Sequence, residues 1–149
     1  MTEQPGNPTA ALAAAVIETF ENLAFMEPEQ VQDGLPVFGE AAICYRLAIE
    51  SPFAGWMCLA MEPTLAATIA GTVWSGDSAE VGEQLCRDTV AEILNTVAGR
   101  FMKEYIPGDQ TFALGLPEPG PSIVASTADW QTFAFSLEGE MFMVLLQMA

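Results

Sequence analysis

The residues best suited to chemistry lie in one segment, where Asp88, Glu92, Asn95 and Gly99 follow one another at spacings of four, three and four. In a helix, such spacings bring side chains onto one face. That face would present two carboxylates and an amide, with a small residue beside them. An amide both donates and accepts hydrogen bonds without titrating, so this face offers polar groups that work without a change of protonation.

The same segment carries an apolar stripe that must face the core. At about 100° per residue, one broad stripe gathers seven side chains: Leu85, Cys86, Thr89, Val90, Ile93, Val97 and Phe101. Asn95 lies almost opposite the centre of this stripe. We therefore predict one continuous helix on which Glu92 and Asn95 are exposed and Ile93 and Val97 are buried.

An ordinary solvated helix face has a similar composition, so a purely structural interpretation remains open. Two details favour a functional surface. Gly99 lies inside the predicted helix, where glycine costs about 1 kcal/mol relative to alanine, and close approach by another molecule would explain it. Glu92 has no basic partner one turn on, because Thr96 occupies that position.

The types of residue present restrict the chemistry. The chain contains no histidine, which excludes the usual general base near neutral pH, the Ser-His-Asp arrangement and histidine metal sites. Its cysteines, Cys44, Cys58 and Cys86, lack Cys-x-x-Cys spacing and lie in apolar patterns. We expect buried thiols in a reducing compartment, with no disulfide and no metal site. Any catalysis must use carboxylates, amides or hydroxyls.

The charge of the chain excludes two classes of partner. Its 149 residues include 20 acidic and 4 basic side chains, for a formal net charge of −16. Such a surface repels phosphate backbones and anionic lipids, so we expect no nucleic-acid binding and no membrane binding. The first residues do not resemble a signal peptide, and no apolar run reaches the ~20 residues of a membrane span. The expected location is cytoplasmic.

The remaining pattern predicts a single α+β domain over residues 1–149, with residues 1–8 as a loose lead-in. Helical periods predict helices over residues 10–26, 62–74 and about 77–105, the last opening with Asp77 three residues before Glu80. Apolar runs predict an antiparallel or mixed sheet of about six strands, at residues 39–50, 55–61, 111–114, 122–126, 130–137 and 141–148. Glu138-Gly139-Glu140 is the predicted turn of a hairpin.

The last predicted strand, Met141 to Met148, is apolar on both faces. As an edge strand it would invite aggregation, so it must be central, covered, or part of an interface. The chain also has few helices with which to cover a sheet. We therefore expect a homodimer joined through strands.

The segment Asp88 to Gly99 has the form D-x-x-x-E-x-x-N-x-x-x-G and resembles the signature helix of the CheC/CheX family of chemotaxis response-regulator phosphatases. Downstream, residues 112–117 (FALGLP) and 121–124 (PSIV) are similar to the strand and proline segment that follow this helix in the family. The resemblance runs from about Pro36 to the C-terminus. The first helix has Glu21 where a second copy of the motif needs asparagine, so the chain is nearest the single-site CheX branch.

The resemblance implies a phosphatase that acts on the aspartyl phosphate of a phosphorylated CheY-type response regulator. Asn95 would enter the partner's active site and orient the attacking water, and Glu92 would pair with the partner's active-site lysine. Asp88, at a position where the family carries aspartate or serine, and Gly99 would belong to the same partner-binding surface. The chain would need no cofactor of its own, because the Mg²⁺ would belong to the receiver partner.

Two other functions remain open on the sequence alone. A protein of this kind could bind receivers, or serve as a scaffold like the flagellar switch components that share the family's fold, without accelerating hydrolysis. An α+β domain could instead bind a small molecule. That function predicts a concave apolar pocket, whereas the motif predicts an exposed convex strip.

Overall fold

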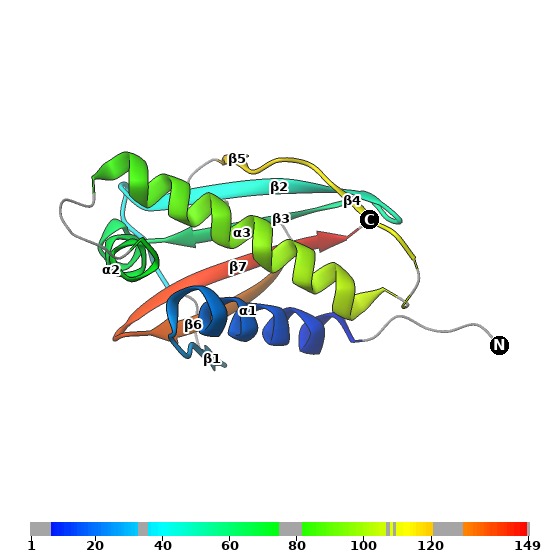
Figure 1. Cartoon of the computed structure of the whole chain (residues 1–149), viewed down its shortest axis with the longest axis horizontal. Helices are drawn as coiled ribbons and strands as arrows, with labels where there is room; N and C mark the ends of the chain where they lie inside the picture. Colours follow the sequence, from blue (N-terminus) through cyan, green and yellow to red (C-terminus); the bar gives the residue numbers. More distant parts are fainter. Residues whose placement is uncertain are drawn as a thin grey trace.

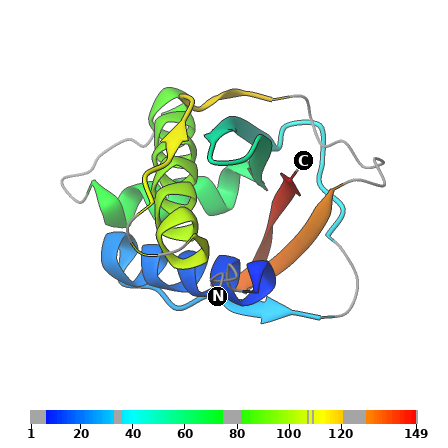
Figure 2. The same cartoon turned by 90° about the vertical axis from the view of Figure 1, so that its right-hand side faces the viewer.

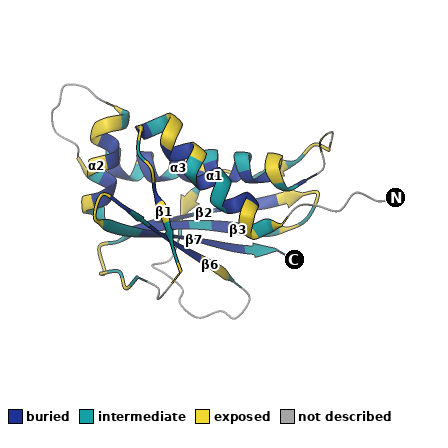
Figure 3. Cartoon of the chain, turned by 90° about the horizontal axis from the view of Figure 1, so that it is seen from below, coloured by how far each residue is buried: buried dark blue, intermediate teal, exposed yellow. Residues whose placement is uncertain are grey.

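Three helices pack on one face of an antiparallel sheet in this computed structural model (Figure 1). The structure describes residues 7–32, 36–74, 82–106, 108, 110–120 and 130–148. The helices are α1 (Pro8–Ala24), α2 (Pro63–Val73) and α3 (Glu83–Tyr105). The strands are β1 (Glu29–Val31), β2 (Ile43–Ser51), β3 (Gly55–Met61), β4 (Ala113–Leu114), β5 (Glu118–Pro119), β6 (Gln131–Leu137) and β7 (Glu140–Met148). From the end and from below, the helices and the sheet form two layers (Figures 2 and 3).

The predicted α+β class is confirmed, and the described residues form seven strands where about six were predicted for the chain. They run in the order β1-β6-β7-β3-β2-β4, β5 also pairs with β2, and every pairing among the described residues is antiparallel. The short strands β1 and β5 were not predicted, because two or three residues show no alternation and Pro119 in β5 is unusual in a strand. The strand predicted at residues 122–126 lies outside the described residues.

Two predicted strands are shorter in the structure. The strand expected at residues 39–50 begins only at Ile43, since a turn in which the Ala42 N–H donates to the Gly39 carbonyl precedes it. The strand expected at residues 111–114 is reduced to β4. Propensity alone indicates such ends poorly, because pairing with a neighbouring strand decides them.

β7 lies inside the sheet, between β6 and β3. Phe142, Val144 and Leu146 belong to the core between sheet and helices and are at most 1% exposed. The Phe142 ring stacks on Phe20 of α1 with 4.9 Å between centroids. Met143, which points to the opposite face, is 4% exposed. β7 is therefore not an edge strand, and the risk of aggregation at an exposed apolar edge does not arise for it.

The hairpin between β6 and β7 turns where the sequence predicts. Glu138 and Gly139 have φ values of 52° and 82°, as in the two-residue turns whose twist matches a hairpin. Glycine accepts such a value without steric cost. Glu140 opens β7, and its carboxylate accepts a hydrogen bond of 2.7 Å from the Thr64 hydroxyl of α2. The hairpin end is thereby attached to the helix layer.

Local capping sets the ends of α1. The helix begins at Pro8, two residues earlier than predicted, because the Asn7 side chain accepts a hydrogen bond of 2.9 Å from the Thr9 N–H. It ends at Ala24, because Phe25 adopts the left-handed conformation with φ of 56°. The predicted end at residue 26 is therefore two residues too late.

Candidate functional site

α3 carries the motif and lies across the helix layer, in contact with α1, α2, β2 and β3 (Figure 1). Its 23 residues make it the longest described helix. It begins at Glu83, after Gly82 at the N-cap position, whereas the predicted start at Asp77 and Glu80 lies outside the described residues. It ends at Tyr105, as predicted.

The buried side of α3 matches the predicted apolar stripe but is wider. Ile93 and Val97 are each 2% exposed, which confirms the prediction for them. Leu85 was expected in the core and is only half-buried. Three residues outside the predicted stripe are buried: Leu94, Ala98 and Met102. The stripe is wider because other helices flank α3 while the sheet lies beneath it.

The opposite side of α3 carries the motif in a row of solvent-accessible positions. Asp88, Glu92 and Asn95 are exposed, and Gly99 is half-buried. The predicted exposure of Glu92 and Asn95 is therefore confirmed. At 1.5 Å per residue, the four positions span about 16 Å along the helix axis. We call these four residues the motif strip.

Neighbours one turn away hold both carboxylates of the motif strip. Gln84 Nε2 donates to Asp88 Oδ1 at 2.8 Å, and Thr96 Oγ1 donates to Glu92 Oε2 at 3.4 Å. No ion pair between described residues includes either carboxylate. The Asn95 amide makes no hydrogen bond to any described residue. The strip therefore presents to solvent an amide and, beside it, a carboxylate that pairs with no described cation.

Gly99 leaves open space at the surface of α3. A Cβ atom placed there would meet nothing within 4 Å, so packing among the described residues does not require glycine at this position. Gly99 lies one turn after Asn95 on the same side of the helix. The missing side chain lowers the surface beside the amide, which lets another molecule approach the helix backbone.

α1 offers no second strip of this kind. Glu18 pairs with Arg100 of α3 at 3.3 Å. Asn22 Nδ2 donates to the backbone carbonyl of Glu18 at 2.9 Å, so this amide is bonded to its own helix. Glu21 occupies the position where a second motif needs asparagine. The described structure thus agrees with a single strip on α3.

The cysteines agree with the expectation of buried thiols. Cys44 and Cys86 are buried, Cys58 is half-buried, and the described residues contain no disulfide. Burial, reinforced by the neighbouring Cys44, raises the pKa of the Cys58 thiol to about 12. Burial and the nearby Glu83 carboxylate raise the pKa of Cys86. Thiols that stay protonated are poor nucleophiles, so the Cys58 and Cys86 side chains serve packing.

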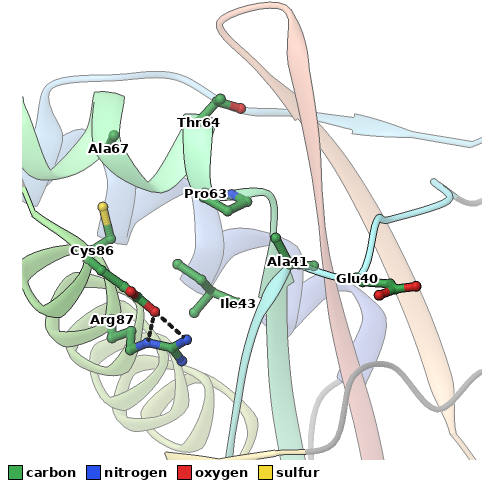
Figure 4. Close-up of a pocket in the computed structure, with 10 residues that line it drawn as sticks. Glu40, Ala41, Ile43, Pro63, Thr64, Ala67, Cys86 and Arg87 are labelled. Carbon is green, nitrogen blue, oxygen red and sulfur yellow. Dashed lines mark hydrogen bonds and ion pairs between the residues drawn. The ribbon is translucent and has the colours of Figure 1, made fainter.

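A separate cavity of about 580 Å³ lies where α2, α3 and β2 begin (Figure 4). Its lining comprises Glu40, Ala41, Ala42, Ile43, Pro63, Thr64, Ala67, Glu83, Cys86 and Arg87. The guanidinium of Arg87 is already bonded to Glu83, from Nε at 3.2 Å and from Nη2 at 2.9 Å. No residue of the motif strip lines this cavity, so a small-molecule site there would be independent of the motif.

Two further classes of site find no support in the described part of the chain. No three cysteine or carboxylate side chains there are arranged to hold a metal ion. No helix there combines the length and the apolar character needed to cross a membrane.

Residues 43–119, which are 77 of the 149, match the family described as "Chemotaxis phosphatase CheX". No curated protein matches the chain. The fold, in contrast, has many solved counterparts. CheX from Vibrio vulnificus is 15% identical, with 99% of this chain and 100% of that chain covered and a TM-score of 0.77.

Two other solved structures share the fold. A chain of the CheX-CheY-BeF3-Mg²⁺ complex from Borrelia burgdorferi is 16% identical, with 95% of this chain and 97% of that chain covered and a TM-score of 0.71. FliY from Thermotoga maritima is 12% identical, with coverages of 92% and 84% and a TM-score of 0.62. At such low identity these structures establish a common fold, and activity must be argued from the site.

Proposed function

The chain belongs to the CheX family, and from this membership we propose that it dephosphorylates the aspartyl phosphate of a CheY-type response regulator. The observation that carries the proposal is the state of the motif strip. Asn95 is exposed without a hydrogen bond to the described residues, next to an exposed Glu92 that has no cation there. The choice of partner is supported by the complex of CheX with CheY from B. burgdorferi.

Hydrolysis of an aspartyl phosphate depends on positioning more than on acid–base chemistry. Water attacks phosphorus and the bond from phosphorus to the aspartyl oxygen breaks, which gives inorganic phosphate and a free carboxylate. The Asn95 amide would accept one hydrogen bond from this water and donate another to it, holding it in line. Such a role needs no change of protonation and so suits a chain without histidine.

The other residues of the motif strip would bind the partner. The Glu92 carboxylate would pair with the active-site lysine of the receiver, a charge-assisted contact that fixes the complex in register. Thr96 already holds one Glu92 oxygen, which reduces the freedom lost on docking. Asp88 would add a polar contact, and Gly99 would permit close approach. Mg²⁺ would be bound by the receiver.

A second candidate function is receiver binding or scaffolding without catalysis, as in a flagellar-switch-like module. The observation that favours it is the shared fold of FliY, a protein that does not carry the CheX name. A fold by itself does not fix an activity. The presence of both Glu92 and Asn95 on one accessible face favours the enzyme over the scaffold.

We also propose a homodimer joined through strands. β7 no longer motivates it, because that strand is central. The remaining support is the outer edge of β6. On that side β1 pairs only with residues 134–136, so residues 131–133, which pair with β7 on their inner side, have no strand on their outer side among the described residues. Such an edge is a template for strand addition. Light scattering should give twice the mass of one chain at micromolar concentration, and a monomer mass would contradict the dimer.

The decisive experiment measures loss of phosphate from a phosphorylated CheY-type receiver with and without this protein. The rate should rise with protein concentration and reach a plateau. Binding to the receiver without any acceleration would refute the phosphatase and favour the scaffold. Asn95→Ala identifies the residue responsible, and its expected effect is developed in the Discussion.

A further inference from the structure

Lys103 differs from the other cations of the chain. The three arginines form ion pairs, Arg46 with Glu118 at 3.8 Å, Arg87 with Glu83 at 2.9 Å and Arg100 with Glu18 at 3.3 Å. Lys103 is exposed and makes neither an ion pair nor a hydrogen bond with the described residues. Although acidic side chains outnumber basic ones by 20 to 4, Lys103 pairs with no carboxylate of the described residues, which sets it apart from the three arginines.

Lys103 lies in line with the motif strip. It follows Gly99 by four residues, so the two positions share one side of α3. At 100° per residue, Lys103 and the four residues of the strip fall within about 80° around the helix axis. Along the axis, Lys103 lies about 12 Å from Asn95 and about 16 Å from Glu92. This side of α3 therefore has carboxylates at one end, a cation at the other, and Asn95 between them.

A structural role at the end of the helix explains Lys103 less well. A cation in the last turn interacts favourably with the helix dipole. Glu104, however, is exposed in the same turn, and its charge opposes that interaction. The two charges largely cancel at the helix terminus. The dipole lies along the helix axis, so it does not explain why Lys103 is on the same side of α3 as the motif strip.

We propose that Lys103 pairs with a carboxylate on the surface of the phosphorylated receiver and fixes the direction in which α3 docks. This inference rests on the proposed function. The receiver would present a cation toward Glu92 and a carboxylate toward Lys103, about 16 Å apart, with the phosphoaspartate between them opposite Asn95. Docking in the reverse direction would bring like charges together at both ends.

The net charge of the chain gives this cation its importance. A charge of −16 repels an acidic protein surface, and a phosphoaspartate site is itself anionic. One cation at the edge of the contact provides local attraction on a surface where acidic side chains greatly outnumber basic ones. Exposed charge pairs are individually weak and act mainly on the association rate and its salt dependence.

The test compares Lys103→Gln and Lys103→Arg with Gln32→Glu. Gln32 is exposed just after β1, at the edge of the sheet away from β2, and Gln32→Glu changes the net charge by the same amount as Lys103→Gln. Because the proposed dimer would use this edge, light scattering must give the same mass for every variant that is compared. Affinity and association rate are measured on a CheY-type receiver loaded with beryllium fluoride and Mg²⁺, at low and high salt. The kinetic constants kcat and KM are measured with the phosphorylated receiver as the substrate.

We expect Lys103→Gln to weaken affinity and raise KM about three- to fivefold at low salt, with kcat unchanged. The difference should disappear near 1 M salt, where the screening length is about 3 Å. Lys103→Arg and Gln32→Glu should both stay close to the unmutated protein. These results would support a local charge contact.

If Lys103→Gln and Gln32→Glu weaken the affinity for the receiver equally, Lys103 acts only through the net charge of the chain, and the proposal is overturned. A loss confined to thermal stability would overturn it as well, by assigning Lys103 to the helix terminus. If the unmutated protein binds the receiver without accelerating hydrolysis, the phosphatase proposal fails while the affinities still decide the role of Lys103. If it does not bind the receiver, both proposals fail.

Discussion

Replacing Asn95 with alanine tests the proposed chemistry with little risk to the fold. Asn95 is exposed and makes no hydrogen bond to the described residues, so truncation breaks no hydrogen bond with them. Alanine is a better helix former than asparagine by about 0.6 kcal/mol. The free energy of unfolding should therefore stay constant or rise slightly, and a loss of activity reports on chemistry.

The size of the expected loss follows from the task assigned to the amide. Two hydrogen bonds to the attacking water, each contributing about 1.5 kcal/mol within a closed interface, give about 3 kcal/mol of transition-state stabilisation. At 1.36 kcal/mol for each factor of ten, kcat should fall by on the order of 10²-fold. Affinity for the receiver should change little, because Glu92 still makes its contact.

The assay measures dephosphorylation at saturating protein, together with binding to a receiver loaded with beryllium fluoride and Mg²⁺. Asn22→Ala is the matched control, since Asn22 is also an exposed helical asparagine but is bonded to its own helix. This control should keep the kcat of the unmutated protein. Full activity in Asn95→Ala would refute the reasoning, and a loss of affinity alone would make Asn95 a docking residue.

Three further changes test the other roles. Glu92→Gln should weaken binding to the loaded receiver about tenfold, because a charge-assisted contact is lost, and unchanged affinity of this variant in a titration would contradict the pairing with lysine. Thr96→Val should weaken binding about two- to threefold, because the hydroxyl that holds Glu92 is lost, while Thr96→Ser should not. Gly99→Ala should raise the free energy of unfolding by about 0.5–1 kcal/mol, since the space there is empty, yet raise KM. A stabilised variant with normal KM would show that no partner approaches at Gly99. The pKa of Cys58 rises from 9.0 to about 12 on folding, so its contribution to stability is lost as pH rises from 9 toward 12; Cys58→Ala should make the fall in Tm over this range shallower, and an identical profile would count against the shift.

The features predicted correctly from the sequence depend on a long regular period. Over 23 residues of α3, the 3.6-residue repeat separates Ile93 and Val97 from Glu92 and Asn95 without ambiguity. The bonds from Gln84 to Asp88 and from Thr96 to Glu92 also follow from spacings of four. A local pattern was therefore enough to locate the motif strip.

The features that the sequence did not reveal depend on contacts between distant segments. An apolar run such as residues 141–148 fits a central strand, a covered strand or an interface equally well, and only pairing with β3 and β6 decides. The pair of Arg100 with Glu18 joins residues 82 positions apart, so the isolation of Lys103 could not be derived from neighbours in the sequence. β1 and β5 are too short to have a period.

The motif strip contains residue types that the stability of the fold does not explain. Asn95 and Gly99 together make α3 less stable than alanine would by about 1.5 kcal/mol, and no hydrogen bond or steric requirement among the described residues explains them. A face that served only stability would favour alanine and paired charges. α3 tolerates the loss because its other face is buried along the core, and tertiary packing supplies most of the stability of such a helix. One side of α3 therefore fixes the helix. The other side gives up stability, which is what the proposed partner-binding role predicts, because function and stability often compete.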